Sequence, residues 1–157
     1  MTQTTLVILK PDAVQRGLMG QIIARFEDKG LTLVGAKMIR ITREMAEKHY
    51  AAHKGKGFYE GLVSFMTSQP VMVLAVRGHK AIDSVRNLMG KTTAYEAAPG
   101  TIRGDLGSSR SYNLVHGSDG VESAAFELEL FFKPGELLDY TRVTETWVVD
   151  ARGGQPE

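Results

Sequence analysis

A histidine followed by a small polar turn is the part of this sequence best suited to chemistry. The stretch Asn-Leu-Val-His-Gly-Ser-Asp-Gly places His116 directly after the apolar pair Leu114 and Val115. We expect its imidazole to emerge where a buried strand ends, beside the backbone N–H groups of the turn and the Ser118 hydroxyl. A neutral imidazole held in this way is a nucleophile or general base near neutral pH. A histidine that only caps the turn is an equally good interpretation of these residues.

A downstream carboxylate favours the catalytic interpretation. Residues 121–132 carry apolar side chains at helical spacing. Glu127 borders this apolar stripe, three residues after Ala124 and four before Phe131. A helix over this run would begin close to His116, so the Glu127 carboxylate could reach the imidazole and fix its orientation.

Three basic residues are candidates for an anion site. Lys10 ends the first apolar run, Arg86 lies in a helical run, and Arg103 stands in the stretch Pro-Gly-Thr-Ile-Arg-Gly-Asp. Taken singly, each is an ordinary surface residue. If the three converge, they form a site for a triphosphate, with Thr92 and Asn113 as neutral donors.

Phe58 and Leu62 are candidates for an apolar contact with a nucleobase. They are four residues apart, so a helix places both on one face, where they could clamp a base. Taken alone, the pair is better explained by ordinary core packing.

Two further patterns fail as motifs. The stretch Met-Gly-Lys-Thr-Thr resembles the end of a phosphate-binding P-loop, but Val85 stands where that motif needs glycine and a helix is predicted before it. His49 and His53 have the spacing of a helical metal pair, but the glutamate of zinc protease helices is missing. Gly55 and Gly57 indicate that the helix is ending. We therefore expect the two histidines at a solvated helix end.

Apolar periodicity predicts the elements that position these residues. The predicted strands are 4–10, 31–41, 70–78 and 112–116. The predicted helices are 19–29, 42–50 with Thr42 as its cap, 58–67, 80–89 and 121–132. The strand at 70–78 is almost wholly apolar, which predicts a central place in the sheet. Residues 90–111 show no periodicity, and a long loop of this kind is usually functional or disordered.

Without the extra helix, the order of elements is β-α-β-β-α-β, the ferredoxin-like split βαβ arrangement. We therefore predict an α+β fold with a four-stranded antiparallel sheet, helices on one face and a long functional loop before the last strand. Residues 1–150 are expected to form a single domain, and residues 151–157 a flexible C-terminal tail.

Composition excludes several classes of protein. The 157 residues contain no cysteine, so disulfides, thiolate zinc sites and cysteine nucleophiles are excluded. A net charge of +1 indicates no general attraction to nucleic acid or membranes. No window approaches the roughly 20 apolar residues of a membrane span. The first apolar run has four residues and lacks a basic segment before it, so no signal peptide is predicted and a cytoplasmic location is expected.

Three separated stretches, in the right order, resemble one family. The stretch 113–120 resembles the signature of nucleoside diphosphate kinases, residues 9–30 are similar to their N-terminal block, and residues 99–105 are similar to a third block. The similarity extends from about residue 6 to residue 147. It implies ping-pong transfer of the γ-phosphate of a nucleoside triphosphate such as ATP to a nucleoside diphosphate through a phosphohistidine on His116.

The resemblance also implies a role for each matching residue. His116, Glu127 and Lys10 match catalytic positions, and Ser118 and Asp119 match the second shell. The implied substrate-binding residues are Lys10, Tyr50, Phe58, Leu62, Arg86, Thr92, Arg103 and Asn113. Mg²⁺ is expected to arrive bridging the substrate phosphates, without dedicated protein ligands.

Three pairs of residues depart from the family pattern, in which Asn-Pro, Arg-Pro and Gly-Arg are usual. They are Thr93-Ala94, Lys56-Gly57 and Ser111-Tyr112. Loss of two prolines predicts looser loops rather than altered chemistry. We expect a homo-oligomer, and a hexamer in preference to a tetramer or dimer.

Two other classes of function compete with the enzyme. A regulatory module could keep the nucleotide site without turnover, and it would bind nucleotide without forming phosphohistidine. An RNA-binding module on the same sheet needs stacking aromatics on its central strands. Residues 4–10 and 111–117 offer no such set, so nucleic acid is not indicated.

Overall fold

The computed structural model describes residues 1–150, and its centre is one antiparallel sheet with the strand order β2-β3-β1-β4. The strands are β1 (Thr2–Leu9), β2 (Thr32–Ile39), β3 (Val71–His79) and β4 (Val115–Gly117). This order and the antiparallel pairing confirm the predicted α+β, ferredoxin-like arrangement. The apolar run at 70–78 is an interior strand, as predicted. The tail predicted at 151–157 lies outside the described residues.

All five predicted helices are present, with ends within two residues of those expected. They are α2 (Met19–Asp28), α3 (Arg43–His49), α4 (Tyr59–Ser68), α5 (Ala81–Met89) and α7 (Val121–Phe131). Thr42 caps α3 by accepting a hydrogen bond from the Met45 amide at 3.1 Å. The short helix α1 (Pro11–Gln15) was not predicted, because five residues are too few to show a period.

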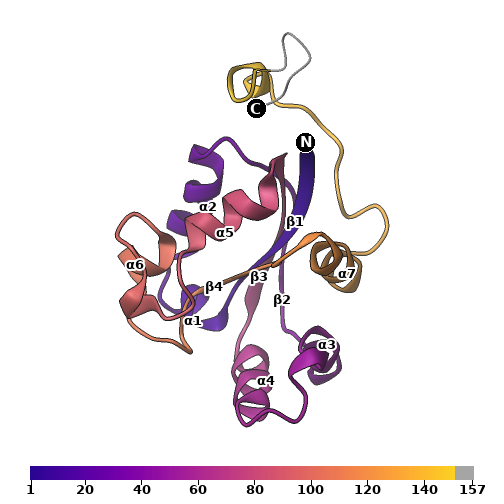
Figure 1. The fold of residues 1–157 in the computed structure, drawn as a ribbon. Coiled ribbons are helices and arrows are strands. Elements are labelled where there is room, and N and C mark those ends of the chain that lie inside the picture. Colours follow the sequence, from indigo (N-terminus) through magenta and orange to yellow (C-terminus); the bar gives the residue numbers. More distant parts are fainter. Residues whose placement is uncertain (151–157) are drawn as a thin grey trace.

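Helices cover both faces of the sheet, so the expectation of a single covered face is wrong. Figure 1 shows α2 and α5 on one side and α7 on the other. The reason lies in β1, where consecutive side chains point to opposite faces. Val7 and Leu9 pack with α2 and α5, whereas Leu6 and Ile8 pack with α3, α4 and α7. The second half of β1, from Leu6 to Leu9, is apolar at every position, so it needs a cover on each face of the sheet.

The fourth strand begins later than predicted. Leu114 has a φ of +74°, a left-handed conformation that ends extended pairing on its N-terminal side. Its amide donates to Asp12 Oδ2 at 3.1 Å, and its carbonyl accepts from the Lys10 amide at 2.8 Å. The β4 ladder with β1 therefore covers only residues 115–117, and it places His116 opposite Ile8.

The long segment at 90–111 contains local structure that periodicity did not reveal. It holds a 3₁₀ turn, η2 (Ala94–Glu96), and the short helix α6 (Ile102–Leu106). The Thr101 hydroxyl caps α6 by accepting from the Gly104 amide at 2.9 Å. An ion pair of 2.7 Å joins Arg25 of α2 to Asp105. The segment is thus attached to the helical layer on one face of the sheet.

We predict that Gly104→Ala destabilises the protein by about 3 kcal/mol, because a Cβ there would lie 2.0 Å from the Ala98 carbonyl oxygen. The matched control is Gly61→Ala in α4, where the added Cβ would meet no described atom within 4 Å apart from the adjacent residues and the backbone of its own helix. Alanine at Gly61 should stabilise the helix by about 0.5–1 kcal/mol. Denaturant unfolding of both variants measures the difference, and equal midpoints would contradict the prediction.

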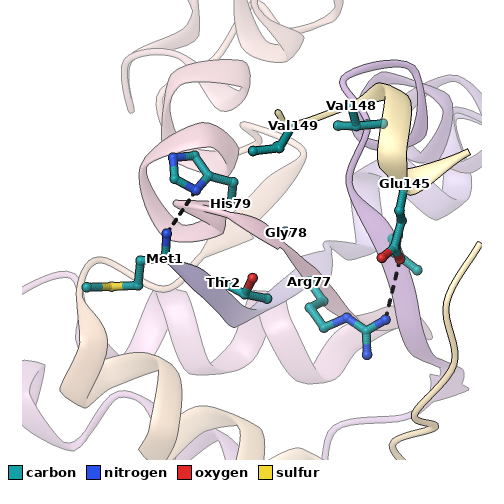
Figure 2. A pocket seen from close by; sticks show the side chains of 10 residues that line it. Met1, Thr2, Arg77, Gly78, His79, Glu145, Val148 and Val149 are labelled. Atoms are coloured by element: carbon teal, nitrogen blue, oxygen red, sulfur yellow. Dashed lines mark hydrogen bonds and ion pairs between the residues drawn. The ribbon is translucent and has the colours of Figure 1, made fainter. Parts of the chain in front are cut away.

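The last described segment crosses back to the start of β1. It carries the 3₁₀ turn η3 (Glu145–Trp147), and Glu145 lies 3.6 Å from Arg77 of β3. Figure 2 shows this end of the sheet, where the amino group of Met1 lies 3.0 Å from His79 Nδ1. The pocket between these residues contains none of the predicted site residues. Within residues 1–150, no helix is long and apolar enough to cross a membrane.

Candidate active site

A cleft of about 840 Å³ gathers most of the predicted substrate-binding residues. Its walls come from the start of α1, the end of α3, helix α4, the loop before β4, and β4 itself. The predicted residues that line it are Lys10, Tyr50, Phe58, Leu62, Thr92, Asn113 and His116. Arg86, Arg103, Ser118, Asp119 and Glu127 lie outside this lining.

His116 is held by the carboxylate of Glu127. Its Nε2 atom lies 3.1 Å from Oε1 and 3.0 Å from Oε2, so helix α7 places the carboxylate against the histidine. Ser118 donates to Glu127 Oε1 at 2.5 Å. Because a carboxylate can only accept, Nε2 carries the ring proton in neutral His116. The lone pair then resides on Nδ1, which is the nucleophilic atom.

Glu127 remains ionised although it is buried. Burial raises the pKa of this carboxyl, but the hydrogen bonds from His116 and Ser118 outweigh burial and lower the pKa below its ordinary value. An ionised carboxylate in contact with an imidazole stabilises positive charge on the ring. The His116 side chain is 23% exposed, so a substrate can reach it from the cleft.

Lys10 and Asn113 form a polar pair in the wall of the cleft. Lys10 Nζ donates to Asn113 Oδ1 at 2.8 Å, and Asn113 Nδ2 donates to the carbonyls of Thr92 and Arg110. Burial, followed by the charge of Arg103, lowers the pKa of Lys10 to about 8. An ammonium group with little water around it and two N–H donors left over is suited to an anionic ligand.

Arg103 connects the long loop to the strand that carries His116. Its guanidinium donates to the carbonyls of Asn113 at 3.1 Å, Gly90 at 3.0 Å and Val115 at 2.6 Å. The residue is 5% exposed, and burial together with the charge of Arg86 lowers its pKa to about 10. The observed contacts position the backbone on both sides of the site.

Arg86 and Asp119 lie close to His116 but outside the cleft lining. Arg86 Nη1 donates to the Gly117 carbonyl at 3.3 Å, and its guanidinium is exposed. Asp119 accepts from Ser123 at 2.5 Å, and this hydrogen bond lowers the pKa of its carboxyl. An exposed cation and an exposed carboxylate therefore lie near His116.

The apolar part of the cleft is formed by α4 and the loop before β4. Phe58 is 55% exposed at the start of α4, so it is free to stack on a planar ligand. Leu62 lies behind it and is half-buried. Tyr112 stacks on Phe65 with ring centroids 4.7 Å apart, and both also line the cleft.

Comparison with known proteins identifies the family. The family model described as nucleoside diphosphate kinase matches residues 3–137. The nucleoside diphosphate kinase of Staphylococcus carnosus is 52% identical over 148 residues, which are 94% of this chain and 99% of that protein. The chain belongs to the nucleoside diphosphate kinase family.

Solved structures of nucleoside diphosphate kinases agree with the fold. A halophilic member from Halobacterium salinarum, in complex with CDP, superposes with a TM-score of 0.92 at 49% identity and covers 94% of this chain and 99% of that one. A member from Borrelia burgdorferi, described as a transition state mimic with bound vanadate and ADP, gives 0.87 at 36% identity, covering 93% and 96%. This chain is accordingly a nucleotide phosphotransferase.

Two of the three pairs that depart from the usual nucleoside diphosphate kinase pattern contribute residues to the cleft wall. Gly57 precedes the exposed ring of Phe58, and Ser111 and Tyr112 precede Asn113. At Thr93-Ala94 the chain begins the turn η2, where the Ala94 amide donates to the Ser109 carbonyl at 3.3 Å. Ala94 is buried, so this part of the loop is packed without the usual proline.

His49 is the residue of this nucleoside diphosphate kinase that sequence reasoning placed wrongly. It was expected at a solvated helix end, but its side chain is 1% exposed and its ring centroid lies 4.7 Å from that of His116. Helix α7 covers the end of α3, and Phe131 packs edge-on against His49. No local signal in the sequence pointed to this burial. In the structure the ring of Tyr50 packs edge-on against His49, and burial raises the pKa of the Tyr50 phenol.

Proposed function

We propose that His116 is the phosphorylated nucleophile of a nucleoside diphosphate kinase that works by ping-pong transfer. The observation that carries the proposal is the contact of Glu127 with His116 Nε2, which leaves the Nδ1 lone pair for attack. Nδ1 attacks the γ-phosphorus of a nucleoside triphosphate such as ATP, and the bond from that phosphorus to the β,γ-bridging oxygen breaks. The nucleoside diphosphate leaves with the bond electrons. A second nucleoside diphosphate then accepts the phosphoryl group from Nδ1.

The walls of the cleft supply the positioning and charge that phosphoryl transfer requires. In this proposal Lys10, Asn113 and Thr92 bind phosphate and ribose oxygens of the nucleotide. Arg86, which lies close to His116, also binds the substrate. The base lies on Phe58 beside Leu62, a stacking contact that does not read hydrogen-bond edges. Arg103 acts through the backbone that it holds, and Tyr50 and Ser118 support the histidine and its carboxylate.

Mg²⁺ fits this site as a companion of the nucleotide. The cleft lining contains no aspartate or glutamate, which agrees with a cation held mainly by substrate phosphates. In this proposal Asp119, an exposed carboxylate near His116, holds one of the waters of the cation. When bound, the cation neutralises charge on the phosphates during transfer.

The intact mass of the protein tests the proposal. Purified protein mixed with Mg²⁺ and ATP, without an acceptor, should gain one phosphoryl group at neutral to alkaline pH. Acid or an added nucleoside diphosphate should remove it. A folded protein that binds nucleotide but gains no mass would instead be the regulatory module that keeps the site without turnover.

The lowered pKa of Lys10 predicts a loss of nucleotide affinity at alkaline pH. Phosphate oxygens favour the ammonium form of Lys10, whose pKa is about 8. At a pH above this pKa, Lys10 must therefore take up a proton when the nucleotide binds. Affinity should fall by up to about tenfold per pH unit above about pH 8. Calorimetry in two buffers of different ionisation enthalpy measures the proton uptake. Lys10→Arg keeps its charge and should remove the uptake, whereas an equal uptake in both proteins would contradict this role.

We also propose that residues 1–150 act as one domain in a cytoplasmic homohexamer. Exposed apolar side chains on the last described segment support an assembly, because Val143 is 93% and Trp147 is 89% exposed. Met38 on the edge strand β2 is also 51% exposed. Sedimentation analysis distinguishes a hexamer from a tetramer, a dimer and a monomer.

A further inference from the structure

Three side chains that bind metals well face one another beside the cleft. His49, His116 and Glu127 each offer a ligand atom within 4.8 Å of the other two. His49 Nδ1 lies 3.2 Å and His116 Nε2 lies 3.0 Å from the same oxygen, Glu127 Oε2. In tetrahedral zinc sites with bonds of roughly 2.0–2.2 Å, neighbouring ligand atoms are roughly 3.3–3.6 Å apart. Small side-chain movements therefore suffice to place an ion among the three.

His49 has nitrogen atoms without another use. Its side chain is 1% exposed, and neither ring nitrogen makes a hydrogen bond to any residue from 1 to 150. The contact with Glu127 has the distance of an ion pair without the geometry of a hydrogen bond. A neutral imidazole with a free lone pair is the form that binds a metal.

We propose that His49, His116 and Glu127 form a Zn²⁺ site whose occupation blocks phosphorylation of His116. Two imidazoles and one carboxylate are an established zinc ligand set that leaves a fourth position for water. The site differs from the pair His49 and His53 rejected above, because its second and third ligands come from β4 and α7. Ion binding does not depend on the proposed function, whereas the blocking effect rests on it.

The block follows from the tautomer of His116. For attack on phosphorus, Nε2 carries the proton and Nδ1 carries the lone pair. For binding Zn²⁺ through Nε2, the lone pair must be on Nε2, so the ring proton moves to Nδ1. The nucleophilic atom is then protonated, and Glu127 is engaged by the ion. Lys10 places a positive charge near His49, which weakens the site compared with an all-protein structural zinc centre.

Co²⁺ as a probe tests the site without any assay of activity. The full-length protein titrated with Co²⁺ should develop visible absorption typical of a four-coordinate ion, saturating at one ion per chain and removed by Zn²⁺. His49→Phe and His116→Ala should abolish the band. The matched control His53→Gln should keep it, because His53 lies outside the three-ligand cluster. Absence of the band in the natural protein, or an equal band in His49→Phe, would overturn the proposal.

His49→Phe is expected to fold, and His49→Gln is a second variant that tests the site if it does not. Phenylalanine at position 49 preserves the ring packing against Phe131 and removes two nitrogens that make no hydrogen bond. If His49→Phe proves unfolded by circular dichroism, His49→Gln retains a polar group of shorter reach and should lower the affinity for Co²⁺ at least about tenfold relative to His53→Gln. An unchanged affinity in folded His49→Gln would equally overturn the site.

A single-turnover experiment tests the block. Protein and Zn²⁺ are both kept in excess over Mg–ATP, so that ATP cannot remove the ion, and phosphohistidine is followed by intact mass. The natural protein should form no phosphohistidine while Zn²⁺ is bound. It should form phosphohistidine again when EDTA is added in an amount equal to Zn²⁺, with Mg²⁺ kept in excess over EDTA so that the nucleotide retains its Mg²⁺. His53→Gln should behave like the natural protein in both conditions. Full phosphorylation of Zn²⁺-loaded protein would refute the block. If the protein forms no phosphohistidine even after EDTA has removed the Zn²⁺, the result refutes the proposed function. The Co²⁺ titration would then still show whether the three side chains bind an ion.

Discussion

Replacing His116 by alanine is expected to lower the rate of phosphoryl transfer between nucleotides by at least about 10⁴-fold. The substitution removes the nucleophile, and no other residue in the cleft lining offers a neutral nitrogen lone pair at the same position. The fold should survive, because the imidazole is partly exposed. Its partner Glu127 still accepts the hydrogen bond from Ser118 when the imidazole is removed. Steady-state rates with ATP and a nucleoside diphosphate measure the loss.

The matched comparison is Glu127→Gln, which keeps the shape of the carboxylate and removes its charge. It should retain phosphohistidine formation at a rate lowered about 10²–10⁴-fold, because the imidazole loses its charged partner and its preferred tautomer. Nucleotide binding to His116→Ala, measured by calorimetry, should stay within a few-fold of the natural protein. Substantial turnover by a folded His116→Ala would contradict the assignment of the nucleophile.

Replacing Arg103 by alanine is expected to cost about 4 kcal/mol or more in the free energy of unfolding. The guanidinium makes three charge-assisted hydrogen bonds to the carbonyls of Gly90, Asn113 and Val115. Its removal leaves these acceptors without their donor in a site where water has little access, and each such loss costs about 1–3 kcal/mol. Denaturant unfolding measures the effect.

Two variants make the Arg103 result interpretable. Arg40→Ala removes an exposed arginine and should change stability by less than about 0.5 kcal/mol. Arg103→Lys keeps the charge without the planar fork and should fall between the natural protein and Arg103→Ala. If Arg103→Ala unfolds like the natural protein but loses nucleotide affinity, the guanidinium serves the phosphates directly. That result would favour the role implied by the family resemblance over the backbone role supported by the contacts.

The amino-acid sequence by itself determined the elements and the reactive motif of this protein. Apolar periods of two and 3.6 residues are local properties, so they located the long helices and most strands to within a few residues. The turn around His116 and the carboxylate at Glu127 are close in sequence, and a helix of known rise connects them. The ferredoxin-like order then follows from the order of the elements along the chain.

Only the tertiary structure decided which face each element covers and which distant residues meet. His49 shows the limit: its neighbours in sequence predict a solvated helix end, and only α7, more than 70 residues later, buries it against His116. Arg103 is a second case, because an arginine that binds phosphate and one that holds backbone carbonyls have the same local sequence. The left-handed Leu114 depends on acceptors and donors supplied by Asp12 and Lys10, about 100 residues earlier. In each case the burial and the hydrogen-bond partner come from another part of the chain, and local periodicity carries no information about them.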